Sequence, residues 1–298
     1  MAPGITNRPN IMKIASLIIA LFLLTSLGLT AQEEEVQDSV VAERPERPAF
    51  ESSFIIDNPT NVLFPKNTLE IQMSHRFGLI NGGTNDLAGI WAPANIRIGA
   101  SYGIHDRLTI GYGTTKFDRL QDFNWKVALF RQTRSEKMPV SISYYGNFTI
   151  DARRKENFSL RQHRYSYFNQ LIIARRITRN FSVQLAPSVS HYNLVEARMR
   201  NDVVALAAGA RYKISPQTSI LIDYSQPFIH HLDGQSLDTD PEPGFSIGAE
   251  FATSGHAFQL FISNQNGIVP QKNYMSNRND FFRGDFLIGF NITRKYNF

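Results

Sequence analysis

One pattern runs through this chain from residue 68 to residue 298: stretches of about ten residues in which apolar and polar side chains alternate. In TLEIQMSHRFG, residues 68–78, positions 69, 71 and 73 are apolar and positions 68, 70, 72 and 74 are polar. Neighbouring side chains of a β-strand point to opposite faces, so each stretch predicts a strand with one apolar face. We predict an all-β fold of about twelve strands, each about long enough to cross a membrane. That count includes RYSYFNQLIIARR, where Asn169 interrupts the apolar face.

The connections between these stretches alternate in length. Short turns fall at IHDR, RSEKM, ITRN, SPQT and TSGH, and longer polar stretches such as TTKFDRLQD and DARRKENFSLRQH lie between them. With an even number of strands, this alternation places both termini of the chain on the short-turn side. The arrangement is typical of a transmembrane antiparallel up-and-down β-barrel with short periplasmic turns and long outer loops.

Alternation alone does not say which face is inside. A soluble lipocalin-like barrel or a β-sandwich would place the apolar face in its core and the polar face in water. Two features favour the membrane barrel. The polar face is rich in glycine and serine, which suits a crowded interior better than a wet surface. The last strand ends on Phe298, and a closed barrel must pair that strand with the first one.

Two segments precede the first strand. Residues 12–32 have a positive residue, Lys13, before an apolar core and a small-residue site at Thr30 and Ala31. Residues 1–31 are therefore predicted to be a signal peptide, with Met12 as a second candidate start and an uncleaved anchor as the rival interpretation. Residues 32–60 are acidic and aperiodic, which predicts a flexible periplasmic lead-in, with a short docking peptide as the alternative. Residues 61–298 are the predicted barrel. The chain contains no cysteine, which excludes disulfides and thiolate metal sites.

The last strand carries Phe290, Tyr296 and Phe298 on one face. A final strand of alternating aromatics that ends in Phe resembles the C-terminal signal of Gram-negative outer-membrane proteins, which the barrel-assembly machinery reads. In addition, TLEIQMSHRFG, ANIRIGASYGIHDRLTIGYG and SVQLAPS resemble an uncharacterised Bacteroidota outer-membrane β-barrel family, a domain of unknown function. The resemblance covers about residues 50 to 298. It implies a fold and an outer-membrane location, and it brings no site residues with it.

Charged residues on the polar face are the first candidates for function. On the wall of a lumen, charges must be paired or hydrated. Mixed signs favour a network that braces a narrow interior, and selectivity for an anionic solute is the alternative. The candidates are Glu70, Arg76, Arg97, Arg107, Lys126, Arg211, Asp223, Glu250 and Asp285.

Two long loops suggest ligands. The first carries a basic cluster, and at the cell surface the nearest anions are lipopolysaccharide phosphates, which suit arginine; a solvated basic loop is the alternative. Its members are Arg153, Arg154, Lys155, Arg161, His163 and Arg164. The second loop carries His230, His231, Asp233, Asp238 and Asp240. Loop histidines with no helix or strand to fix them are a weak signal, so no metal site is predicted.

No G-x-S-x-G, H-E-x-x-H or phosphate-loop motif is present. His75 and His191 each follow a serine on a predicted strand, so the paired side chains point to opposite faces. We expect no enzyme, no cofactor and no nucleic-acid partner. The sequence favours a passive or selective channel for small solutes, anions among them, in the outer membrane of a Gram-negative bacterium. A non-conducting structural or surface-interaction barrel is the alternative. The expected partners are membrane lipid, lipopolysaccharide and the barrel-assembly machinery.

Deleting Phe298 is expected to slow assembly more than it weakens the finished fold. One aromatic on the outer face contributes only about 1.5 to 3 kcal/mol of burial, which is modest for a barrel whose strand hydrogen bonds are all internal. Appending Lys-Lys should be at least as harmful, because it places charge beside the lipid. The measurement is heat-modifiable gel mobility of outer-membrane fractions. Undiminished folded barrel in both variants would remove the argument for a terminal signal.

Overall fold

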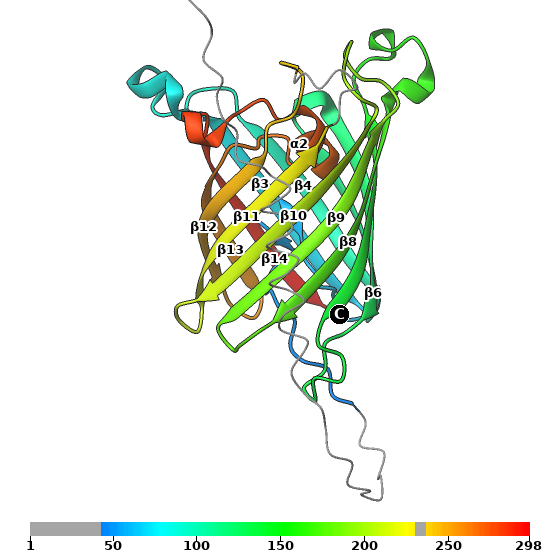
Figure 1. The fold of residues 1–298 in the computed structure, drawn as a ribbon, viewed down its shortest axis with the longest axis vertical. Helices are drawn as coiled ribbons and strands as arrows, with labels where there is room; N and C mark the ends of the chain where they lie inside the picture. The colour runs from blue at the N-terminus through cyan, green and yellow to red at the C-terminus, as the bar shows by residue number, and fades with distance from the viewer. Residues whose placement is uncertain (1–42, 230–236) are drawn as a thin grey trace, which may run out of the picture. The chain divides into compact units, whose positions relative to one another are not determined.

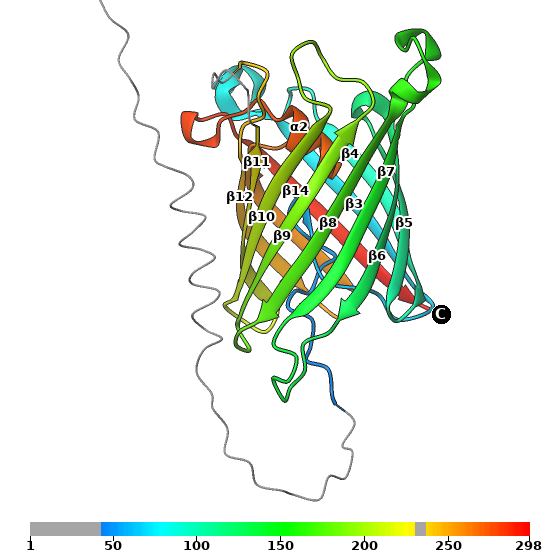
Figure 2. The ribbon, with the colours of Figure 1, turned by 45° about the vertical axis from the view of Figure 1, so that its right-hand side comes forward.

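The computed structural model describes residues 43–229 and 237–298. Within these residues, twelve strands form one closed antiparallel barrel (Figures 1 and 2). The strands are β3 (Thr68–Leu79), β4 (Asn95–His105), β5 (Leu108–Thr115), β6 (Leu120–Phe130), β7 (Ser141–Asp151), β8 (Tyr165–Arg176), β9 (Phe181–Tyr192), β10 (Asp202–Lys213), β11 (Thr218–Phe228), β12 (Gly244–Ala252), β13 (His256–Ser263) and β14 (Leu287–Asn297). The predicted barrel architecture is confirmed.

The remaining elements are short. Strands β1 (Phe54–Ile55) and β2 (Asn58–Pro59) form a separate two-stranded sheet, and α2 (Pro270–Ser276) lies in the connection between β13 and β14. Short 3₁₀ segments occupy the loops: η1 (Ile80–Asp86), η2 (Phe117–Arg119), η3 (Lys155–Asn157), η4 (Arg161–Arg164) and η5 (Phe281–Arg283). No helix in the described ranges is long and apolar enough to cross a membrane.

The strands turn their apolar faces outward. Ile98 on β4 is 56% exposed, whereas Glu70 and Arg76 on β3 are each only 1% exposed. A soluble barrel would show the opposite pattern, because water rather than lipid would face its outer wall. The lipocalin-like alternative is therefore wrong. The ambiguous segment is strand β8, and its Asn169 faces outward, where the hydroxyl of Tyr144 donates to its amide oxygen at 2.5 Å.

Short turns join the strands at one end of the barrel, and the C-terminus lies at that end (Figure 1). One predicted long loop is wrong: TTKFDRLQD leaves only residues 116–119 between β5 and β6. The turn is tight because Asp118 and Arg119 adopt left-handed φ angles of 56° and 50°. The hydroxyl of Thr115 also spans it, donating to the carbonyl of Phe117 and accepting from the amide of Leu120.

The last strand closes the barrel onto the first. Phe290 on β14 lies opposite His75 on β3, and their rings stack with centroids 5.1 Å apart. Beyond the strand, the amide of Phe298 donates to the carbonyl of Asn67 at 3.0 Å. Phe298 thus belongs to the seam between the two chain ends.

Ile98→Arg is expected to weaken folding into lipid by about 2 to 4 kcal/mol, because it places a charge on the lipid face near mid-membrane. Ser101→Arg is the matched control on the opposite face of the same strand. Ser101 pairs in register with Glu70 and is only partly buried, so this substitution should cost less. A refolding titration in lipid bilayers measures both. Equal or reversed penalties would contradict the assignment of the faces.

Candidate functional site: an occupied lumen

The predicted flexible lead-in, residues 32–60, requires a correction. Its described part meets the barrel at the short-turn end, where the amide of Glu46 donates to the carbonyl of Gln132 at 2.7 Å. Residues 49–64, hereafter the plug, then run through the lumen with most side chains buried (Figure 1). The sequence prediction was based on the acidic residues 33–46. The apolar residues that fill the lumen come after them, at residues 49–64.

Apolar side chains of the inner wall receive the plug. One cluster consists of Ala49, Phe50, Ile55, Ile56, Val62 and Phe64 of the plug with Ala174, Leu221 and Phe261 of the wall. Two wall glycines leave room for the plug: a Cβ at Gly209 would lie 3.2 Å from the side chain of Ile55, and one at Gly103 would lie 2.7 Å from the carbonyl oxygen of Phe64. The glycines of the polar face thus accommodate backbone and side chains of the plug.

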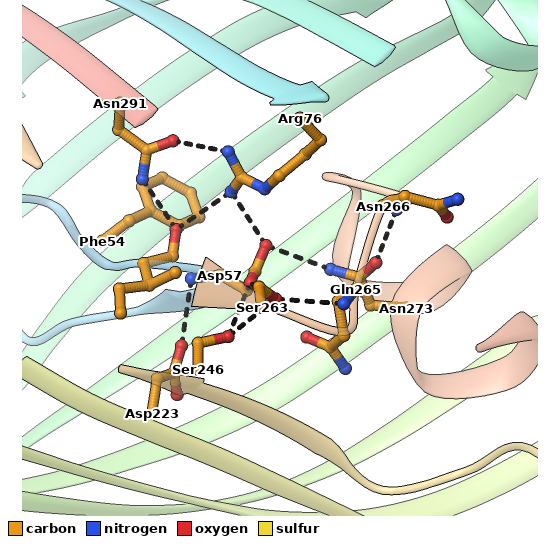
Figure 3. A network of polar contacts seen from close by, with 12 residues as sticks. Phe54, Asp57, Arg76, Asp223, Ser246, Ser263, Gln265, Asn266, Asn273 and Asn291 are labelled. Atoms are coloured by element: carbon orange, nitrogen blue, oxygen red, sulfur yellow. Dashed lines mark hydrogen bonds and ion pairs between the residues drawn. The ribbon is translucent and has the colours of Figure 1, made fainter. Parts of the chain in front are cut away.

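Asp57, at the turn between β1 and β2, is the most heavily bonded residue of the plug (Figure 3). Its carboxylate forms an ion pair with Arg76 of β3 at 2.9 Å, and both side chains are almost fully buried. The hydroxyls of Ser246 and Ser263 also donate to it, at 3.3 and 3.2 Å. A buried ion pair of this kind is stable only while both partners are present, because removing one leaves an uncompensated charge.

Asp223 of β11 holds the same turn from the other side (Figure 3). It accepts the backbone amides of Asp57 and Asn58 at 3.0 and 3.1 Å and the side-chain amide of Asn58 at 2.6 Å. Three N–H donors from the plug therefore satisfy a buried carboxylate of the wall.

Further wall charges bind the plug in the same way. Ser53 donates to Glu70 at 2.5 Å, and Ser52 donates to Glu250 at 2.6 Å. The ammonium of Lys126 donates to the backbone carbonyls of Ser53 and Val62, each at 3.1 Å. Carboxylates of the wall thus accept hydrogen bonds from hydroxyl groups of the plug, and a wall ammonium group donates to carbonyl groups of the plug.

The nine predicted lumen residues divide into two groups. Seven are buried inside the barrel: Glu70, Arg76, Arg97, Lys126, Arg211, Asp223 and Glu250. Arg107 lies instead in the exposed turn between β4 and β5, and Asp285 lies before β14, where Asn81 donates to it at 3.3 Å. Both were placed in the lumen because the alternation was extended past the ends of the strands. Arg97 pairs with Asp122 of β6 at 2.8 Å, a contact made within the wall.

The connection between β13 and β14 fills the lumen from the long-loop end, where α2 lies in the mouth of the barrel (Figure 2). Gln271 donates to Asn147 and Thr149 of β7 at 3.0 and 2.8 Å. The ring of Tyr274 stacks on Phe168 at 5.3 Å, and its hydroxyl donates to Asn58 of the plug. The plug and α2 therefore meet inside the lumen.

Little space remains where the two segments meet. The cavity beside Arg76, Arg97 and Asp122 measures about 10 Å³, room for about one water molecule. In the described residues, the lumen is thus filled rather than open at this level.

The outer basic cluster is partly paired. Arg153 forms ion pairs with Asp151 at 2.6 Å and Asp118 at 3.3 Å, and these carboxylates raise the pKa of Arg153. Arg153 and Arg164 both stack on the ring of Phe158, 5.8 and 5.4 Å from its centroid. The other basic side chains of the loop, on Arg154, Lys155 and Arg161, are exposed.

The weak metal signal falls largely outside the described residues, which exclude His230, His231 and Asp233. Within 43–229 and 237–298, no group of three or more His, Cys, Asp or Glu residues is arranged to hold a metal ion.

A signal for the plug was present in strand β8. Beside Ser166 and Gln170, its inner face carries Phe168, Ile172 and Ala174, all fully buried, so both faces of this strand carry apolar residues. The prediction treated this segment as ambiguous because of Asn169 on the outer face and did not use the apolar residues of the inner face. A barrel strand with apolar residues on both faces indicates a partner inside the lumen as well as lipid outside.

A protein-family model described as "Membrane bound beta barrel domain (DUF5777)" matches residues 50–296. Among solved structures, the NanC porin is 7% identical, with 77% of this chain and 99% of that chain covered and a TM-score of 0.49. An outer membrane channel from Pseudomonas putida F1 is 14% identical, with 79% and 97% covered and a TM-score of 0.48. The KdgM porin is 8% identical, with 78% and 99% covered and a TM-score of 0.46. No curated protein matches the sequence.

Asp57→Ala is expected to destabilise the bound plug by about 3 to 5 kcal/mol, because Arg76 remains buried without its carboxylate. Release of the plug is measured on a cysteine introduced as Ala49→Cys. Residue 49 is buried in the parent protein, and the chain has no cysteine of its own that would also react. The rate of labelling at this position by a membrane-impermeant maleimide should rise at least about tenfold in the Asp57→Ala background.

The control is Ser135→Cys in the exposed β6–β7 turn, which should label at the same fast rate in both backgrounds. An unchanged rate at position 49 would show that the Arg76 pair does not retain the plug.

Proposed function

We propose that this chain, which belongs to the family of membrane-bound β-barrel domains (DUF5777), forms a channel whose lumen is closed at rest by its own N-terminal plug. The barrel lies in the outer membrane, the membrane in which closed antiparallel barrels of this type occur. The resemblance of its strand motifs supports a Bacteroidota origin. In this proposal, small solutes pass once the plug has moved out of the lumen.

One observation carries the proposal: three buried charges of the wall take their partners from the plug. Arg76 is paired with Asp57, and Asp223 and Lys126 bind plug backbone groups. A barrel built only as a permanent structure could pair such charges within its wall, as Arg97 and Asp122 do. When the plug leaves, Arg76, Asp223 and Lys126 would need water, and a hydrated polar wall is what solute passage requires.

The contacts of the plug are also exchangeable. Many of them are hydrogen bonds and ion pairs that water can replace, and the net value of such a hydrogen bond is about 0.5 to 3 kcal/mol. The apolar cluster around Phe50 and Ile55 opposes release. The balance between the polar contacts, which water can replace, and the apolar contacts, which water cannot, determines how often the channel opens.

The second candidate is a non-conducting structural or surface-interaction barrel. The observation that favours it is the filling of the lumen from both ends, where Tyr274 of α2 contacts Asn58 of the plug. If α2 stays in place when the plug leaves, the passage remains blocked. Conductance therefore separates the two candidates.

The partners follow from the two ends of the barrel. The exposed Arg154, Lys155 and Arg161 support binding of lipopolysaccharide phosphates at the outer face. Phe298, at the seam between β14 and β3, supports recognition by the barrel-assembly machinery.

We further propose that the barrel is not an enzyme. Ser74 is buried on the inner face of β3, whereas His75 faces outward and stacks on Phe290. His191 likewise lies on the outer face next to the inward Ser190. This arrangement separates each serine from the histidine that would activate it.

Planar-bilayer recording tests the channel. Wild type should show rare openings, and Asp57→Ala should raise the open fraction at least about tenfold, because it removes the carboxylate that pairs with Arg76. The side chains of Ser53 and Glu70 are hydrogen-bonded. If both are replaced by cysteine (Ser53→Cys and Glu70→Cys) in the Asp57→Ala background, a short, cleavable reagent that reacts with two thiols can cross-link the plug to β3. Cross-linking should abolish the openings, and cleaving the linker should restore them.

Arg107→Ala, a charge change of equal size in an exposed turn, is the control and should behave like wild type. If Asp57→Ala exposes the plug to labelling but passes no current, the non-conducting alternative holds.

A further inference from the structure

An arginine-rich cavity lies at the short-turn mouth of the barrel. It measures about 560 Å³ and is formed by the N-terminal segment at residues 46–47, the β6–β7 turn and the β8–β9 turn. Figure 2 shows the β6–β7 turn and the N-terminal segment projecting together below the barrel wall. Three separate parts of the chain thus meet around one space, hereafter the arginine pocket.

Four arginines line this pocket: Arg47, Arg134, Arg176 and Arg179. Two glutamates accompany them, and Glu136 is already paired with Arg175 at 2.9 Å. Across residues 43–229 and 237–298, the guanidinium groups of Arg47, Arg134 and Arg179 have no carboxylate partner. The pocket therefore carries an excess of positive charge with donors available to a ligand.

A carboxylate of the chain itself already occupies part of the pocket. Glu46 lies 3.4 Å from the guanidinium of Arg176 and accepts the amide of Arg47 at 2.7 Å. This contact shows which chemistry the pocket takes: an oxyanion that can accept hydrogen bonds from planar guanidinium groups. The cavity is large enough for a ligand with several such groups.

The pocket meets the barrel wall at the short-turn end of β8. On β8 the even-numbered residues Phe168, Ile172 and Ala174 face inward, and Arg176 continues the same row. Gln132, which accepts the amide of Arg176 and donates to its carbonyl, is likewise buried. Arg47, Arg134 and Arg179 are exposed at the periplasmic mouth, so a solute there can reach the pocket.

We infer that the arginine pocket is a binding site for a small polycarboxylate on the periplasmic side, and that Glu46 is the internal carboxylate with which this ligand competes for Arg176. Glu46 lies three residues before the plug begins, so the ligand would bind where the plug is anchored. The site is defined by its own geometry and does not require that the barrel conducts.

Isothermal titration of the full-length protein in lipid nanodiscs, with citrate as the probe, tests the site. Citrate should bind saturably, and Arg134→Gln with Arg179→Gln should weaken binding by about tenfold or more, since each removes a charged donor that has no carboxylate partner among the described residues. Arg154→Gln with Arg161→Gln, an equal charge change at the opposite mouth, is the matched control and should leave binding unchanged. Absence of saturable binding, or equal losses in the two double variants, would overturn the site.

The role of Glu46 has its own measurement. Glu46→Gln should tighten citrate binding several-fold by removing the internal competitor. The control is Glu43→Gln on the same segment; Glu43 pairs with Lys137 at 3.1 Å, and hydrogen bonds from Ser135 and Lys137 lower its pKa. An equal gain in citrate affinity from both variants would indicate that only the loss of a negative charge matters. It would overturn the proposal that Glu46 competes with the ligand for Arg176. Loss of citrate binding when anionic lipid replaces neutral lipid in the nanodiscs would assign the pocket to headgroups instead.

Discussion

Lipid offers no hydrogen bonds, so every polar group in the spanning part of this chain must find its partner inside the barrel. Closure of β14 onto β3 satisfies the backbone, and the alternation of side chains sends the charged residues inward. Small barrels fill their interiors with wall side chains, and larger ones leave space that a plug can occupy. Here a segment of the chain fills that space, and the wall charges take it as their partner.

This constraint explains why parts of the structure were predictable from the sequence. Strand number follows from local alternation, which the twelve-stranded barrel repeats from strand to strand. The face toward lipid followed from the glycine and serine of the polar face, and the seam followed from the terminal Phe298. Most of the lumen charges followed from the alternation as well. Arg107 and Asp285 did not, because alternation has no meaning beyond the ends of strands.

The plug was not predictable from alternation, because it is held by contacts between residues far apart in the sequence. Asp57 and Asp223 are separated by 166 residues, and no local pattern connects them. The helix α2 was missed for the same reason: its contacts with Asn147 and Phe168 exist only once the barrel has closed. Strand β8, with apolar residues on both faces, was the one local sign of an occupied interior.

The central claim is that the plug lies in the lumen and can leave it, and hydrogen–deuterium exchange in outer-membrane vesicles tests this most directly. The amides of Asp57 and Asn58 donate to Asp223, and that of Thr60 donates to the carbonyl of Ser53. These amides should be protected, yet exchange well before those of β9 and β10, because the plug opens without unfolding the barrel. Exchange as fast as in an unfolded chain would place residues 49–64 outside the lumen. Protection equal to that of the strands would mean that the plug is a permanent part of the wall.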